Sequence, residues 1–212
     1  MKNAVVIPVL FFFNLFILNG QTPTFADFKA QFAPASLPFS MTADDLNAQL
    51  ENRAAKAKRL SWEYFQFLPT LEESARFSRM PVYPEPVASF ETPEYYAVLY
   101  NTGRGLTKNF KSYHIAIFDK QGNHIATHFV AGVNTTTLTS ATIDETLHAK
   151  VQAFEINWSK DLQANGLDGN SILNLTPAGR QSFELTSGGM VEQVNWSYKP
   201  SSLTASTKGD AK

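Results

Sequence analysis

The segment 111–131 (KSYHIAIFDKQGNHIATHFVA) has the sharpest local pattern in the chain and most constrains the fold. Apolar residues alternate on both sides of a turn, with Ile115 and Ile117 before it and Ile125 after it. Such alternation is typical of half-buried β-strands, because side chains point to opposite faces with a period of two. Gly122 can adopt the positive φ that closes a three-residue loop with a bulge. The segment therefore predicts an antiparallel β-hairpin.

The register of this hairpin decides which side chains face each other. A loop of 120–122 pairs Ile117 with Ile125 and gives one coherent apolar face. A two-residue loop of Gln121 and Gly122 would pair Ile117 with Ala126 and mix the two faces. A slip of one residue is disfavoured when one face is buried, so we expect the three-residue loop.

The expected register places His114 opposite His128 on the second face. Directly opposed residues have Cβ atoms about 5 Å apart, so the two imidazoles could share a metal ion. His124 cannot join them, since it lies roughly 13 Å along the strand from His128 at ~3.3 Å per residue. His148 is a third candidate ligand whose position the sequence does not fix. A metal site usually needs three or four ligands. We therefore expect a cross-strand polar pair on a solvated or partly covered face, with a metal site at His114 and His128 as the alternative.

A β pattern continues from Glu94 toward the C-terminus, interrupted by short turn signals. The expected strands lie near 95–100, 113–118, 124–131, 135–143, 147–158, 171–176, 181–186 and 190–198. Short connections imply antiparallel neighbours, because parallel pairs need long crossovers. The expected fold class is α+β: N-terminal helices followed by an antiparallel β-meander of about eight strands, either closed or folded over like a sandwich.

Two helices are expected before the strands. One spans 24–33, with Thr24 as its cap and phenylalanines on one face. The other spans 42–59, with Thr42 as its cap, acidic residues in its first turn and basic residues in its last. The aromatic segment 60–68 either continues this helix or starts a strand.

The first residues of the chain have the features of a signal peptide: Lys2, an apolar stretch over 4–18 and a polar break. The apolar stretch is shorter than the about 20 residues that a spanning helix needs. Cleavage is expected after Gly20, with cleavage after Ala26 as the alternative. The expected divisions are a signal peptide over 1–20, a helical preface and Pro-rich connector over 21–93, an antiparallel β domain over 94–198 and a disordered tail over 199–212.

Composition excludes several classes of function. The formal net charge is −1 and no basic face stands out, so nucleic acid is not an expected partner. The chain has no cysteine, which excludes thiol catalysis, disulfides and thiolate metal sites. The acidic pairs Asp44–Asp45, Glu72–Glu73 and Asp144–Glu145 are explained by solvated caps and turns, and nucleophile and metalloprotease motifs are absent from the sequence. We expect no cofactor.

The run FADFKAQF (25–32), then LPF (37–39), a helix, a Pro-rich connector and a strand pair turning at FDKQGNHI (118–125) resembles uncharacterised exported β-rich proteins of Gram-negative bacteria. The resemblance covers about 25–143. It implies export and a β-rich fold, and it assigns no activity and no catalytic residue.

These observations favour a non-enzymatic exported domain with a binding or structural role, located in the periplasm, at the cell surface or in the medium. The expected partner is an envelope component, a glycan or a peptide, and exposed aromatics such as Trp62, Trp158 and Trp196 could line such a face. No stable membrane span is expected after signal cleavage. One alternative is a metal-binding protein or metal-dependent hydrolase that uses His114 and His128. Another is a carrier of a small apolar ligand, if the meander closes into a barrel.

Overall fold

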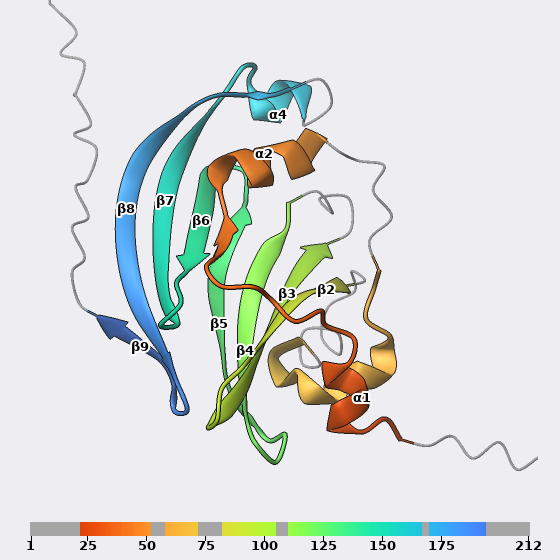
Figure 1. Cartoon of the computed structure of the whole chain (residues 1–212). Coiled ribbons are helices and arrows are strands. Elements are labelled where there is room, and N and C mark those ends of the chain that lie inside the picture. Colours follow the sequence, from red (N-terminus) through yellow and green to blue (C-terminus); the bar gives the residue numbers. More distant parts are fainter. Residues whose placement is uncertain (1–21, 52–57, 72–81, 105–109, 167–169, 194–212) are drawn as a thin grey trace, which may run out of the picture.

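A computed structural model describes residues 22–51, 58–71, 82–104, 110–166 and 170–193. The expected signal peptide and tail lie outside these residues, as does the short Glu72–Glu73 pair. The described residues fold mainly as one antiparallel β-sheet whose strands follow one another in meander order, as the sequence predicts. The sheet is strongly curved but not closed (Figure 1).

The sheet contains nine described strands in the order β2 to β9, with β1 paired to β6. Their bounds are β1 Phe39–Met41, β2 Val82–Glu91, β3 Tyr95–Arg104, β4 Ser112–Asp119, β5 His124–Val133, β6 Thr137–Ile143, β7 His148–Trp158, β8 Ile172–Thr186 and β9 Gly189–Gln193.

Among the helices whose bounds lie in the described residues, three short ones precede β2 and one lies between β7 and β8. They are α1 (Phe25–Lys29), α2 (Ala43–Glu51), the 3-10 helix η1 (Trp62–Phe67) and α4 (Leu162–Asn165). The helices are therefore not confined to the N-terminal part of the described chain.

The caps of the first two helices are confirmed. The Thr24 hydroxyl accepts the Asp27 N–H and the Asp27 carboxylate accepts the Thr24 N–H, which makes a capping box. Thr42 and Asp45 do the same for α2. The expected extent of the second helix is wrong at its end, because 58–60 are not helical. Residues 52–57 lie outside the described chain.

The expected Pro-rich connector is wrong over most of its length, because β2 is a regular strand there. Its prolines are tolerated because β2 is at the end of the strand order, where a proline has one side without a ladder partner. The pairing with β3 also shifts by one residue between Pro86 and Ala88. The sheet thus begins before Glu94.

The expected break between the strands at 171–176 and 181–186 is also wrong, because β8 runs through it. Phe154 faces Pro177 and Ala153 faces Gly179, so Ala178 is an extra residue in a β-bulge. A bulge is one of the few places where a strand accepts proline and glycine. Two expected strands are therefore one long strand.

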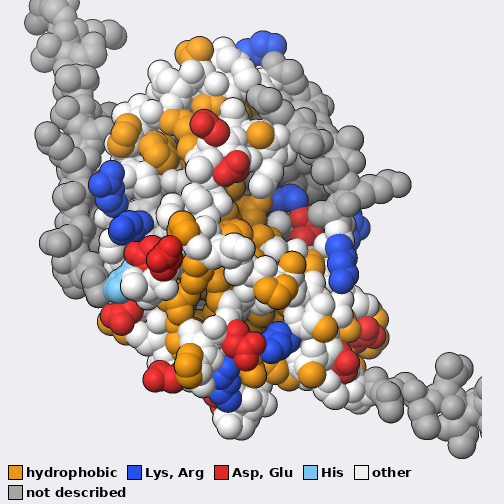
Figure 2. Space-filling model, in the orientation of Figure 1, with side chains coloured by type: hydrophobic (Ala, Val, Ile, Leu, Met, Phe, Trp, Pro, Cys, Tyr) orange, Lys and Arg blue, Asp and Glu red, His pale blue; other side chains and the backbone are white. Residues whose placement is uncertain are grey.

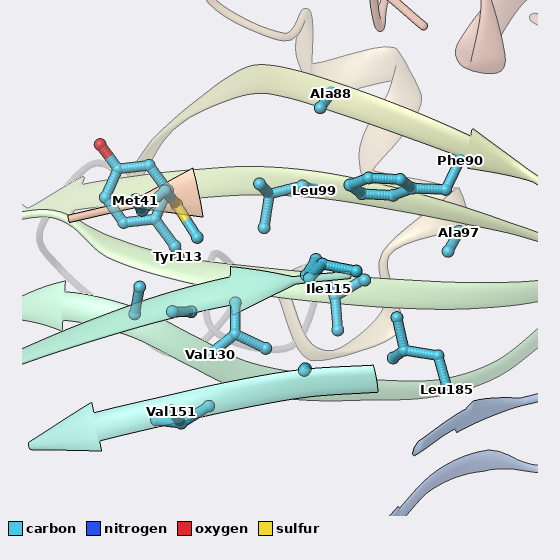
Figure 3. Packing of buried hydrophobic residues seen from close by; sticks show 14 of the residues in the cluster. Met41, Ala88, Phe90, Ala97, Leu99, Tyr113, Ile115, Val130, Val151 and Leu185 are labelled. Carbon is cyan, nitrogen blue, oxygen red and sulfur yellow. The ribbon is translucent and has the colours of Figure 1, made fainter. Parts of the chain in front are cut away.

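One hydrophobic core fills the concave face of the sheet (Figure 3). Leu99, Tyr113, Ile115 and other inward side chains of β2 to β8 meet there, and Leu46 of α2 packs against them. The end of β8 reaches across to the other side of the sheet, where the Tyr95 hydroxyl donates to the Leu185 carbonyl at 2.8 Å. This hydrogen bond joins β3 to β8 across the curved sheet.

A second hydrophobic core lies on the opposite face of β3 and β4. Phe28 of α1 and Leu68 after η1 pack there against Val98, Tyr100 and Phe118 of the strands. Figure 1 shows α1 and η1 together beside this part of the sheet. The middle strands are therefore buried on both faces, and neither face of the predicted hairpin is open along β4.

The turn of the predicted hairpin is fixed by its own side chains and by α1. The Asp119 carboxylate accepts the N–H groups of Gln121 and Asn123 at 2.9 and 2.8 Å. Gly122 has a φ of +88°, and a Cβ at this position would lie 2.5 Å from the Phe25 ring. Glycine is required here both by the backbone conformation and by the close approach of α1.

Gly122→Ala is expected to lower the free energy of unfolding by roughly 1–3 kcal/mol, because alanine must adopt a positive φ and displace Phe25. Urea unfolding measures the change. Gly188→Ala is the matched control, since its nearest contact would be an ordinary 3.7 Å and its φ is not positive. Equal stability of the two variants would contradict the packing described here.

Candidate functional site: an apolar cavity at the sheet edge

A cavity of about 630 Å³ lies where the chain passes from α1 around the edge of the sheet. Its walls come from α1, the segment 30–37, the hairpin of β2 and β3, and the turn between β6 and β7. Most of the wall is apolar. The main apolar lining residues are Phe32, Pro34, Leu37, Phe90, Ala97 and Leu147.

One wall is held against the sheet by backbone hydrogen bonds. The Ala35 N–H donates to the Ser89 carbonyl at 2.9 Å, and the Ser89 N–H donates to the Ala33 carbonyl at 2.8 Å. Pro34 and Ser89 thus form an isolated parallel bridge at the outer edge of β2. The crossing segment covers part of this edge and fixes Pro34 in the cavity wall.

The facing wall is the turn between β6 and β7. The Asp144 carboxylate accepts the hydroxyl of Thr146 at 2.7 Å and the N–H of His148 at 3.0 Å, and these bonds hold the pKa of Asp144 below its ordinary value. Leu147 adopts a positive φ of 62°, and its carbonyl accepts the Leu185 N–H at 3.1 Å. The turn is therefore fixed on the sheet with Leu147 in the cavity wall.

Charged groups gather on the rim beside α1. The Glu91 carboxylate accepts from Lys29 at 3.1 Å and from Lys120 at 3.2 Å. Hydrogen bonds from Lys29 and then from Lys120 lower the pKa of Glu91. The same two ammonium groups lie 4.2 and 3.9 Å from the centre of the Tyr96 ring, within cation–π range. Lys29, Glu91 and Tyr96 all line the cavity.

Figure 2 shows that hydrophobic side chains gather along the middle of the face drawn in Figure 1, with acidic and basic side chains on both sides. A surface of this kind is typical of small-molecule sites, which combine apolar walls with a few polar groups.

The expected pairing of His114 with His128 is wrong. Phe118 faces His124 as the three-residue loop predicts, but a bulge at Ile125 then shifts the register by one residue. Beyond it His114 faces Phe129, and His128 faces Ile115. Because successive residues of β4 point to opposite faces, the two histidines lie on opposite sides of the sheet.

Each histidine of the hairpin has its own surroundings. His114 stacks on Tyr100 with ring centres 5.5 Å apart. His124 contacts the Thr127 hydroxyl at 2.8 Å. Nε2 of His128 accepts the Met190 N–H of β9 at 3.2 Å, and burial lowers the pKa of the imidazole. His128 therefore links β5 to β9.

The direct pairing of His114 with His128, which suggested a metal site, is not present. A metal site at these two residues stays a prediction. Within the described ranges, no three side chains of the histidine, cysteine, aspartate and glutamate types come together to hold a metal ion. His148, the third candidate, contacts the Thr146 hydroxyl in the turn between β6 and β7.

The tryptophans do not form a common face among the described residues. Trp62 on η1 is 80% exposed. Nε1 of Trp158 donates to the Thr135 carbonyl at 2.7 Å, and its ring contacts Phe110. Trp196 lies outside the described residues. A glycan or peptide as the partner stays a prediction.

Sequence reasoning missed the cavity and its rim. Phe32, Phe90 and Tyr96 are apolar or aromatic residues with no distinctive spacing, and their alignment depends on how α1 crosses the sheet edge. Of the residues at the rim, only Lys120 could be placed from the local sequence, because the predicted turn puts it at the tip of the hairpin.

No family model, curated protein or solved structure matches the chain. In the parts of the chain that the structure describes, no helix is both long enough and apolar enough to cross a membrane. The site must therefore be interpreted from its own geometry.

His128→Gln is expected to reduce the loss of stability on acidification. Burial holds the pKa of His128 in the folded chain below its ordinary 6.5, so the unfolded chain binds the proton first as pH falls. Wild-type stability should decline from above pH 6.5 down to the lowered pKa. Glutamine can still accept from Met190 but does not titrate in this range.

Urea unfolding at several pH values between 5 and 8 measures this difference. His124, whose pKa burial also lowers, keeps part of the pH dependence in the variant. Parallel stability curves for the wild type and His128→Gln would contradict the assignment of His128 as a partly buried neutral acceptor.

Proposed function

We propose that the protein is an exported, non-enzymatic binding protein whose cavity at the sheet edge holds a small, mostly apolar molecule. The cavity itself is the observation that carries this proposal. Its volume of about 630 Å³ lies within the 300–1,000 Å³ typical of small-molecule sites.

The buried floor of the cavity supports an apolar ligand. Phe32 and Phe90 are only 4% and 5% exposed, and Ala97 is fully buried. These three side chains form a packed floor, and the half-buried Leu37 and Leu147 offer the apolar surface that a ligand would remove from water, at about 25 cal/mol per Å².

The charged groups of the rim, Lys29, Lys120 and Glu91, are paired with one another. Paired charges of this kind are better suited to orienting a ligand than to transferring a proton.

The proposed ligand differs from the glycan or peptide that composition favours. The proposal corresponds instead to the alternative of a small apolar ligand carrier, but it puts the ligand at a different place in the fold. That alternative required a dry interior within a closed barrel, whereas the sheet is open and its concave face is packed with side chains. The space available is at the open edge of the sheet, where Phe90 and Ala97 of the concave core form part of its lining.

Nile red, a neutral apolar dye, tests the cavity. We expect saturable binding to the wild type, followed by the rise in dye fluorescence. Ala26→Phe, which places a ring in the cavity wall, should weaken binding at least fivefold. Ala48→Phe is the matched control, since Ala48 is also an exposed helical alanine and does not line the cavity.

Both variants should unfold at similar temperatures, because both alanines are on the surface of a helix. Absence of saturable binding by the wild type would refute the proposal. Equal affinity of Ala26→Phe and Ala48→Phe would place the dye elsewhere.

The N-cap of α1 indicates where the proposed signal peptide would be cleaved. Cleavage after Ala26 would remove Thr24, which caps α1, and Phe25, whose ring lies 5.0 Å from that of Phe118. Cleavage after Gly20 would keep both. We therefore propose processing near Gly20.

Mass spectrometry of the chain recovered from the periplasm or medium of a Gram-negative host checks the processing site. The expected mature N-terminus is Gln21. A mature chain that begins at Asp27 would contradict the role given to Thr24 and Phe25, and retention of the full chain in the cytoplasm would contradict export.

A further inference from the structure

The geometry points to an amphiphile with an anionic head, such as an alkyl carboxylate, as the ligand of the cavity. The inference rests on the proposed function and adds the chemical class of the ligand. Its apolar tail would lie against Pro34, Leu37 and Leu147, which are among the more exposed apolar residues of the lining, and its carboxylate would lie at the rim between Lys29 and Lys120.

Two cations and one anion meet at the rim beside α1, with Lys120 reaching Glu91 from outside the cavity lining. Two ammonium groups, those of Lys29 and Lys120, share the single carboxylate of Glu91. An anionic head would balance the second ammonium group, whereas a cationic head would meet two like charges. The rim thus selects the sign of the ligand's charge.

The exposed fractions of Lys29, Lys120 and Glu91 indicate which of these side chains a ligand can displace. Lys29 and Lys120 are 34% and 27% exposed, while Glu91 is 56% exposed. The lysines are held over the Tyr96 ring, and Glu91 is the most exposed of the three charged side chains. An incoming carboxylate can therefore replace Glu91 at the two lysines while these keep their places on Tyr96.

The opposite wall sets the orientation of the ligand. Glu145, an exposed residue of the turn between β6 and β7, also lines the cavity. Its negative charge disfavours an anionic head at that end. The head is therefore directed to the lysines and the tail toward Leu147 and the apolar wall.

Decanoate, decanol and decylammonium have the same chain and differ in the charge of the head. Displacement of bound Nile red at pH 8 measures their affinities, below the concentrations at which decanoate and decylammonium form micelles and at which decanol separates from solution. We expect decanoate to bind at least fivefold more tightly than decanol, and decylammonium more weakly than both. The preference for decanoate should shrink as salt is added, since the rim is partly exposed.

The double variant Lys29→Gln/Lys120→Gln should bind decanoate no more tightly than decanol. Lys150→Gln is the control, because Lys150 is exposed and lies beside Asp144, away from the lysine pair. It should keep the wild-type preference. Circular dichroism confirms that each variant is folded.

The outcomes separate the two proposals. Equal binding of decanoate and decanol by the wild type would overturn the anionic head while the apolar cavity stands. A preference for decanoate that survives in the double variant would overturn the assignment to Lys29 and Lys120. Failure of the wild type to bind Nile red or any of the three amphiphiles would overturn the cavity itself.

Discussion

The structure depends on the burial of β3 and β4 on both faces. The run YYAVLY at 95–100 alternates between the two cores: Ala97 and Leu99 face the concave core, while Val98 and Tyr100 face the core under α1. A strand that is apolar on both faces is stable in water only if both are covered. The N-terminal part of the chain supplies this cover, with α1 on one face and α2 on the other (Figure 1).

The candidate site is a consequence of this double cover. To reach both faces, the chain between α1 and β1 must pass around the edge of the sheet, and it does so beside Ser89 of β2. This crossing leaves the cavity between the passing segment and the β2–β3 hairpin. It also brings Lys29 of α1 to Glu91 of β2, where Lys120 arrives from the hairpin turn. Three groups far apart in the sequence thus meet at one rim, where their net charge can select a ligand.

The hairpin shows how far local reasoning extends. Its turn, its glycine and the pairing of Phe118 with His124 were predicted, because they depend on residues within a few positions of Gly122. The rest of the register was wrong. The prediction assumed a single buried face, whereas with both faces buried the apolar pattern does not exclude a bulge at Ile125. Ile125 and Phe129, expected to face inward, are 36% and 48% exposed.

Short-range forces decide the helix caps at Thr24 and Thr42, the hairpin turn and the antiparallel meander, whose short connections allow few other pairings, and all three could be predicted from the residues alone. The face that each histidine occupies, the open sheet, and the places of the cavity and the two lysines are seen only in the folded chain. Each of these depends on a shift of one residue or on contacts between distant segments. Neither leaves a periodic signal in the chain, since packing energy depends on which surfaces meet and not on their spacing in sequence.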